Sequence, residues 1–197
     1  IDFSVIKKKE NFLSPDKIQL NNDQKKAVLV INKLLFKPIQ PLVLEGVTGS
    51  GKTEVFFEAI ESVIKKKQQA LIMVPEISLT PQLETRFLKR FGFLPYVWHS
   101  KISEKKRKEI WHRCYVGESM IVIGARSSLF LPFKKLGLIV VDEEHDASYK
   151  QEDNIRYQAR DLAIVRAQID KAFIILSSAT PSLETQNNIN KKKYKHV

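Results

Sequence analysis

The sequence contains a single cysteine, Cys114, among its 197 residues. One thiol excludes an internal disulfide and any zinc site built from several thiolates. The four histidines are scattered and lack the short spacings that metal-ligand pairs show: His99, His112, His145 and His196. We therefore expect no zinc in this chain, and we expect any metal ion to be held by oxygen atoms.

Long hydrophobic segments are also missing. No stretch approaches the roughly 20 uncharged apolar residues that a membrane-spanning helix requires. A charge stands at Asp2, where a signal peptide would lead into its apolar core. With 43% apolar residues, the chain is long enough to form one globular domain. The composition predicts a soluble cytoplasmic protein with no membrane partner.

Negative charge is scarce, because 33 Lys and Arg residues against 22 Asp and Glu residues give a formal charge of +11. Positive charge favours phosphate-rich partners such as nucleic acids. Lysine triplets at 7–9, 65–67 and 191–193 supply much of this excess. The middle triplet would end a helix, where cations complement the helix dipole without any ligand. The net charge by itself therefore leaves DNA binding open.

Short apolar runs alternate along the chain with polar segments of helical periodicity. The runs are short and rich in β-branched residues, which predicts buried parallel strands at 42–44, 70–74, 120–123, 138–141 and 173–176. The intervening patterns predict helices over 24–36 (capped by Asn22 or Asp23), 53–66, 81–91, 104–116 and 159–169, and another beginning near 181–184. We expect Trp111 and Cys114 to be packing residues. The alternation predicts an α/β fold with a mostly parallel central sheet and helices on both faces.

A phosphate-binding loop is indicated between the first predicted strand and the helix after it. Residues 46–53 read G-V-T-G-S-G-K-T and match the pattern G-x-x-x-x-G-K-[ST]. Glycines let successive backbone N–H groups point at phosphate oxygens, and the helix N-terminus adds partial positive charge. Lys52 would reach the β- and γ-phosphates, and the Thr53 hydroxyl would bind Mg²⁺. The other residues expected to bind nucleotide are Gly46, Thr48, Gly49, Ser50 and Gly51.

An acidic motif, Asp142-Glu143-Glu144-His145, follows the predicted strand at 138–141. Beside a phosphate-binding loop, Asp142 would bind Mg²⁺, and Glu143 would orient or deprotonate the attacking water, as phosphoryl transfer to water requires. We therefore expect Lys52, Asp142 and Glu143 to be the catalytic residues. Glu144 and His145 either face solvent, cap the next helix or take part in the site.

These motifs, with Ser178-Ala179-Thr180, resemble motifs I, II and III of superfamily 2 helicases. Five segments resemble more narrowly the PriA-type primosomal replication-restart helicases: 46–55, 74–82, 121–127, 142–151 and 179–185. The resemblance runs in order from about residue 20 to the end. It implies that 21–197 form the first of two RecA-like P-loop NTPase lobes, as a fragment of a longer protein. Residues 1–20 would then be an approach segment or linker.

The resemblance implies roles for further residues. Gln24 would hydrogen-bond adenine, unless it is an ordinary surface residue at a helix start. Thr80, Gln82 and Arg126 would grip DNA phosphates without reading sequence, although Arg126 could instead serve an internal carboxylate. Ser178 and Thr180 would couple hydrolysis to movement, unless they only cap a helix.

The polar segment 149–157 resembles the aromatic-rich loop that signals DNA occupancy to the ATP site in this family. Its candidates for DNA binding or coupling, together with His145, are Tyr149, Lys150, Arg156 and Tyr157. Interleaved aromatic rings and cations can stack on bases and hold phosphates. The usual tryptophan of that loop is Ile155 here, so stacking would fall to the two tyrosines.

The function implied by the resemblance is an ATP- and Mg²⁺-dependent DNA helicase with 3′ to 5′ polarity that remodels stalled replication forks and promotes primosome assembly. Its partners would be forked or single-stranded DNA, primosome proteins, single-strand-binding proteins and the second lobe. A lobe by itself would bind ATP but turn it over poorly. Two alternatives remain: a small-molecule P-loop kinase, and a basic DNA-binding module with a structural, non-hydrolysing ATP site.

Overall fold

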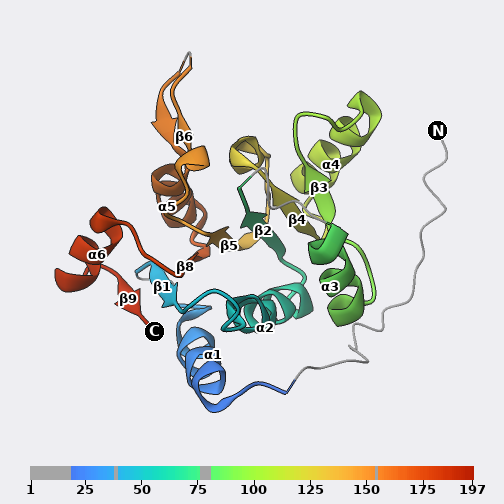
Figure 1. Cartoon of the computed structure of the whole chain (residues 1–197). Coiled ribbons are helices and arrows are strands. Elements are labelled where there is room, and N and C mark those ends of the chain that lie inside the picture. Colours follow the sequence, from blue (N-terminus) through green and yellow to red (C-terminus); the bar gives the residue numbers. More distant parts are fainter. Residues whose placement is uncertain (1–18, 38–39, 76–80, 154) are drawn as a thin grey trace.

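A seven-stranded sheet forms the centre of the computed structural model, which describes residues 19–37, 40–75, 81–153 and 155–197, apart from the side chains of 81, 82 and 84 (Figure 1). The strand order is β3-β4-β2-β5-β8-β1-β9, and neighbouring strands pair in parallel. The strands are β1 (Leu42–Glu45), β2 (Gln69–Met73), β3 (Tyr96–Trp98), β4 (Ile121–Gly124), β5 (Leu136–Asp142), β8 (Phe173–Ser178) and β9 (Lys195–His196). An antiparallel hairpin, β6 (Lys150–Gln151) with β7 (Tyr157–Gln158), stands apart from this sheet.

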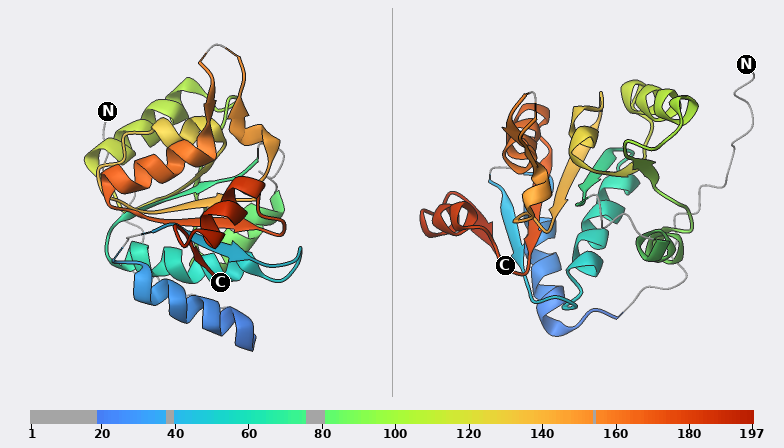
Figure 2. Two further views of the ribbon diagram at one scale, coloured as in Figure 1. Left: turned by 90° about the vertical axis from the view of Figure 1, so that its left-hand side faces the viewer. Right: turned by 45° about the horizontal axis from the view of Figure 1, so that its top comes forward.

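Helices cover both faces of the sheet, as Figure 2 shows. They are α1 (Asn22–Leu34), α2 (Lys52–Lys65), α3 (Pro81–Phe91), α4 (Glu104–Val116), α5 (Ala159–Asp170) and α6 (Leu183–Asn190), with short 3₁₀ turns η2 (Arg126–Phe130) and η3 (Ala147–Tyr149). The predicted α/β fold is therefore confirmed. None of the helices in the described ranges is long and apolar enough to cross a membrane.

Two hydrophobic cores lie on opposite faces because side chains alternate along each strand. In β2, Ala70 and Ile72 pack with α1, α2 and α3, whereas Leu71 and Met73 pack with α4 and α5. The five strands predicted from apolar runs are all present, because strands buried on both faces are apolar at nearly every position. The predicted approach segment lies almost entirely outside the described residues.

The N-terminus of α1 differs from the predicted cap at Asn22 or Asp23. The cap is Asn21, whose side chain accepts from the backbone N–H of Gln24 at 2.9 Å. The Gln24 side chain accepts in return from the Asn21 backbone at 2.8 Å, which completes a capping box. Because this capping box places Gln24 at the third helical position, the helix begins at Asn22, two residues before the predicted start at Gln24.

Four strands, β3, β6, β7 and β9, carried no clear apolar signal. β3 lies at one edge of the sheet and is only partly buried, β9 is a charged two-residue strand held by backbone pairing to β1, and the β6–β7 hairpin is polar. The expectation that Trp111 is a packing residue is wrong. Its side chain is 48% exposed on α4 and stacks on Tyr115, with ring centroids 5.5 Å apart.

Cys114, by contrast, is fully buried between α4 and the sheet, and burial raises the pKa of its thiol to about 12. Because the thiolate is the reactive form, we expect the native chain to resist alkylation at mildly alkaline pH and to react fully in guanidinium chloride. Mass spectrometry after iodoacetamide treatment measures both. Equal labelling of native and denatured chain would contradict the packing of α4.

Candidate nucleotide and nucleic-acid site

The candidate site lies where β1, β8 and β5 end side by side. Register pairs Glu45 of β1 with Ser178, and Asp142 of β5 with Ser177. Two strand spacings, roughly 10 Å, therefore separate the ends of β1 and β5. The backbone N–H of Gly46 donates to the Ser178 carbonyl at 3.1 Å, and the Ser177 hydroxyl donates to Asp142 Oδ1 at 2.8 Å. The phosphate-binding loop and the acidic motif thus share one edge of the sheet.

The loop after β1 has the backbone that its glycines permit. Gly49 and Gly51 have φ values of +80° and +83°, in the left-handed region that other residues rarely adopt. A Cβ at Gly46 would approach Ser50 Oγ to 2.7 Å, so a side chain there would displace the Ser50 hydroxyl. Lys52, the first residue of α2, donates from Nζ to the Gly46 carbonyl at 2.6 Å. Its ammonium group therefore already lies over the loop.

A cavity of about 450 Å³ lies between the start of α1 and this loop. Asn21, Gln24, Gly46, Ser50 and Lys52 contribute to its lining, and its volume is typical of a small-molecule site. The Gln24 side-chain amide donates to the Ser50 carbonyl at 2.8 Å while its oxygen holds the Asn21 backbone. Gln24 thus lies at the cavity and ties α1 to the loop. The side chain would need to exchange these bonds to contact a base.

The acidic motif begins at the tip of β5. Burial raises the pKa of Asp142, opposed by the hydrogen bond from Ser177, and the nearby Lys52 ammonium also lowers this pKa. Glu143 has a φ of +48°, an uncommon value for a residue with a side chain. Such backbone strain is typical of functional sites. The Asp142 carboxylate is therefore held by Ser177, and the chain turns through a left-handed residue directly after it.

The oxygen atoms available at this edge fit a magnesium ion. The Thr53 hydroxyl follows Lys52 in the first turn of α2, and the Asp142 carboxylate stands across β8. Mg²⁺ commonly takes one or two protein oxygens and completes its shell with phosphate and water. Within the described ranges, no three His, Cys, Asp or Glu side chains gather as a metal site. An ion held by Thr53 and Asp142 would take its remaining ligands from phosphate and water oxygens.

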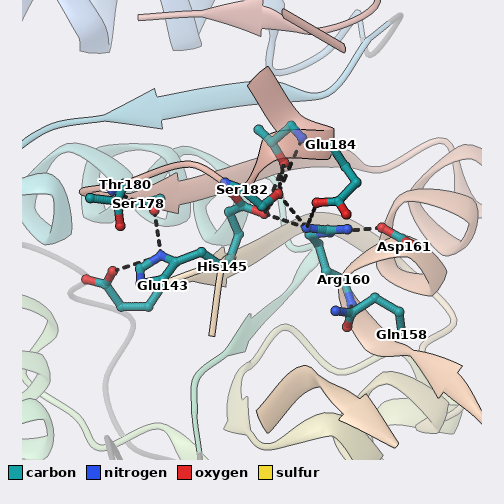
Figure 3. Close-up of polar contacts among 11 residues, drawn as sticks. Glu143, His145, Gln158, Arg160, Asp161, Ser178, Thr180, Ser182 and Glu184 are labelled. Carbon is teal, nitrogen blue, oxygen red and sulfur yellow. Dashed lines mark hydrogen bonds and ion pairs between the residues drawn. The ribbon is translucent and has the colours of Figure 1, made fainter. Parts of the chain in front are cut away.

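Glu144 is the residue that the sequence placed least well. It is fully buried and forms the centre of a polar cluster at the start of α5 and α6. Arg160 and Ser182 of this cluster are labelled in Figure 3. Arg160 donates from Nη1 to Glu144 Oε2 at 3.1 Å and to Ser182 Oγ at 2.7 Å. The Ser182 backbone N–H and the Thr185 hydroxyl donate to the same carboxylate at 2.8 and 3.0 Å. Neither solvent exposure nor a simple cap describes Glu144.

Arg160, two residues after the end of the β6–β7 hairpin, was not predicted as a site residue. Its side chain is only 8% exposed and pairs with Asp161 at 2.9 Å in addition to Glu144. An arginine beside an aspartate at a polar helix start gave no signal of burial. The cluster joins the acidic motif to the segment after Thr180 and to the hairpin.

His145 points toward the segment after β8, as Figure 3 shows. Its Nδ1 lies 2.7 Å from Ser178 Oγ and 3.7 Å from Glu143 Oε2. The backbone N–H of Thr180 donates to the same Ser178 hydroxyl at 3.0 Å. The structure therefore brings together three residues predicted to couple hydrolysis to movement: His145, Ser178 and Thr180.

Tyr149 must be corrected as a candidate for base stacking. It is fully buried, and its hydroxyl donates to the Asp142 carbonyl at 2.6 Å. Its ring packs in the hydrophobic core between the sheet and helices α4 and α5, which leaves neither face of the ring open to a nucleobase. Only a coupling role toward the acidic motif remains a prediction for this residue.

Arg126 donates from Nη1 to the Lys150 carbonyl at 2.5 Å, so it serves a backbone group at the base of the hairpin rather than a carboxylate. Lys150 pairs with Glu152 at 2.6 Å on the surface, and Arg156 is exposed. Tyr157 is partly buried and packs edge-on against Phe130, with centroids 5.5 Å apart.

The hairpin that carries Lys150 and Tyr157 extends away from the sheet (Figure 1). Thr80 lies outside the described residues. Gln82 lies in the first turn of α3, and its side chain is likewise outside them. Contacts of these residues with DNA therefore stay predictions.

Several known bacterial proteins are similar to this chain in sequence. The chain is similar to replication restart protein PriA of Rickettsia typhi, at 54% identity over 91% of this chain and 27% of the relative. For PriA of Haemophilus influenzae the identity is 48%, over 92% and 25%. For PriA of Bacillus subtilis it is 42%, over 93% and 23%. The chain thus spans about a quarter of the length of these relatives.

Solved helicase structures share the fold. The Pyrococcus furiosus Hef helicase domain aligns at a TM-score of 0.64 and 20% identity, over 94% of this chain and 39% of that one. RecG bound to a three-way DNA junction aligns at 0.62 and 25% identity, over 87% and 22%. The DEAD/DEAH box helicase family matches residues 21–189. With its phosphate-binding loop and acidic motif on one sheet edge, the chain belongs to the DEAD/DEAH box helicase family.

Proposed function

We propose that this chain is the first motor lobe of a PriA-type, ATP-dependent DNA helicase that acts in replication restart. The observation that carries the proposal is the shared edge of β1, β8 and β5, which brings together the loop that holds Lys52 and the acidic motif that begins at Asp142. Similarity to PriA from several bacteria supports the biological setting. That setting is the bacterial cytoplasm, with forked or single-stranded DNA as substrate.

Each residue has a defined part in the proposed reaction. The loop N–H groups and Lys52 would hold the β- and γ-phosphates, and Thr53 and Asp142 would hold Mg²⁺, which when bound would neutralise phosphate charge. Glu143 orients the attacking water and accepts its proton as the bond to the γ-phosphate forms. The Glu143 carboxylate lies 3.7 Å from His145 Nδ1 and is partly exposed. ADP and inorganic phosphate leave as products.

This lobe supplies the contacts on one side of the nucleotide, and the second lobe would supply those on the other side. Helicase ATP sites of this type form between two lobes, and a cation from the second lobe stabilises the charge on the transferred phosphoryl group. We therefore infer that this chain alone binds ATP but hydrolyses it poorly. Polarity from 3′ to 5′, primosome proteins and single-strand-binding proteins belong to the whole protein and are inferred from the relatives.

The two alternatives fit the structure less well. A small-molecule kinase does not account for the hydrogen bonds that join His145 and Thr180 through Ser178 beside the acidic motif. A purely structural ATP site does not account for a glutamate with a positive φ, Glu143, next to a partly buried aspartate, Asp142.

Replacement of Lys52 tests the phosphate assignment. Because Lys52→Ala removes a charge-assisted contact to phosphate, we expect ATP affinity to fall by about 2–5 kcal/mol, or at least about 30-fold. Titration calorimetry with the 197-residue chain measures the affinity. Lys105→Ala, which removes an exposed lysine on α4, is the matched control and should bind ATP normally. Unchanged binding in the Lys52 variant would contradict the assignment.

Replacement of Glu143 tests hydrolysis, and it requires the longer parent protein with both lobes. Glu143→Gln keeps the size of the side chain but cannot accept a proton. We expect DNA-stimulated ATP turnover to fall about 10²- to 10⁴-fold while ATP binding is retained. Glu104→Gln, on the exposed surface of α4, should leave turnover unchanged. Full turnover in the Glu143 variant would assign the catalytic base elsewhere.

Replacement of Asp142 tests the metal site through stability and pH. Because burial raises the pKa of Asp142, the folded chain binds the proton more tightly than the unfolded chain, and the ionised form costs stability. We expect Asp142→Asn to raise the Tm of the ligand-free chain at neutral pH. This gain should shrink as the pH falls through the folded-state pKa, where the wild-type carboxyl is also neutral.

Calorimetry across pH measures the Tm difference for Asp142→Asn, and nucleotide titration with and without Mg²⁺ measures the metal. The variant should lose the Mg²⁺ dependence of ATP binding. A Tm difference that grows toward acid, or full Mg²⁺ dependence in the variant, would contradict the assignment.

A further inference from the structure

Arg86 on α3 reaches the first turn of α2, next to the phosphate-binding loop. Its Nη1 donates to the Thr53 hydroxyl oxygen at 3.2 Å, and its Nη2 pairs with Glu54 Oε1 at 2.8 Å. The two arms of one guanidinium thus contact two consecutive residues of the nucleotide-binding helix. No motif in the sequence pointed to Arg86, and the proposed function assigns it no role.

The contact with Thr53 involves the oxygen proposed to bind magnesium. A hydroxyl oxygen has two acceptor lone pairs and one proton. The bond from Arg86 takes one lone pair and leaves the other for the ion. It also restricts rotation of the Thr53 side chain. Groups that hydrogen-bond a metal ligand from outside commonly set its orientation and change metal affinity about 10- to 100-fold.

A cation close to a magnesium site would normally repel the ion. Here the Glu54 carboxylate, which is only 10% exposed, offsets the charge of Arg86. The aromatic ring of Phe57 lies below the guanidinium, at 5.9 Å from its carbon to the ring centroid. The next arginine of α3, Arg90, pairs separately with Glu58 and Glu61, at 2.8 and 2.6 Å, and keeps α3 docked on α2. Arg86 is therefore not the only arginine that joins α3 to α2 through an ion pair.

We propose that Arg86 is a positioning residue that orients the Thr53 hydroxyl for Mg²⁺ through its fork between Thr53 and Glu54. The inference rests on the proposed function, because it requires that Mg²⁺ and ATP bind at the loop. It also gives α3 a direct connection to the metal ligand. Gln82 lies in the first turn of α3, and Thr80 precedes that helix in the sequence, so the predicted DNA-contacting segment leads directly into the helix that carries Arg86.

A charge-neutral pair of substitutions tests this inference. The double variant Arg86→Met with Glu54→Gln removes both arms of the fork without changing the net charge. Arg86→Lys keeps the charge but replaces the fork with one ammonium group, which cannot make both contacts in the same geometry. Lys89→Met, at an exposed position of α3, is the matched control. Circular dichroism and Tm first establish that each variant is folded.

Two quantities are measured with the 197-residue chain: ATP affinity in EDTA, and the Mg²⁺ concentration that half-saturates the metal-dependent increase in affinity. We expect the double variant to need about tenfold more Mg²⁺, with its metal-free ATP affinity unchanged, because Arg86 contacts Thr53 and not the phosphates. Arg86→Lys should resemble the double variant, and Lys89→Met should resemble the wild type.

Several results would overturn the inference. An equal loss of affinity with and without Mg²⁺ would make Arg86 a phosphate ligand, and a lower Tm with unchanged binding would make it purely structural. A lower Mg²⁺ requirement would mean that Arg86 obstructs the ion, and wild-type behaviour of Arg86→Lys would mean that charge alone matters. Failure of the unmodified chain to bind ATP at all would instead overturn the proposed function, and this inference with it.

Discussion

The site depends on one constraint: β8 lies between β1 and β5, and all three strands run parallel. Parallel pairing places the carboxyl ends of the three strands on the same edge of the sheet, so the residues that follow the strands lie close to one another. Ser177 and Ser178 at the end of β8 then contact both neighbours, one through Asp142 and the other through Gly46. Small side chains at these two positions leave room for the loop on one side and the carboxylates on the other.

The site is also stabilised by the buried ion pair between Glu144 and Arg160. Two charges removed from water stabilise little in themselves, but removal of either partner from such a pair typically costs about 3–5 kcal/mol. Because Ser182 and Thr185 also donate to Glu144, the start of α6 is tied to the acidic motif. Arg160 lies two residues after the hairpin strand β7, so one side chain connects the hairpin to Glu144, the carboxylate between Glu143 and His145.

Much of this could be read from the sequence, for identifiable reasons. The apolar runs of β2 and β5 are continuous because both faces of each strand are covered, and Ser103 caps α4 as its residue type predicts. The sequence did not predict features that depend on contacts between distant segments rather than on residue type. β9 is a strand only because β1 offers it backbone partners. Tyr149 has the composition of a base-stacking residue, yet its ring fills the core beneath Asp142.

By itself the sequence determined the phosphate-binding loop, because only its glycines permit that backbone, and it determined the alternation that makes an α/β sheet. Local chemistry suffices for both, since each depends on neighbours within a few residues. Tertiary structure alone decided which distant groups meet: Arg86 with Thr53, Gln24 with Ser50, and Arg160 with Glu144. Those meetings depend on strand order and helix packing, and residue spacing along a chain carries no information about either.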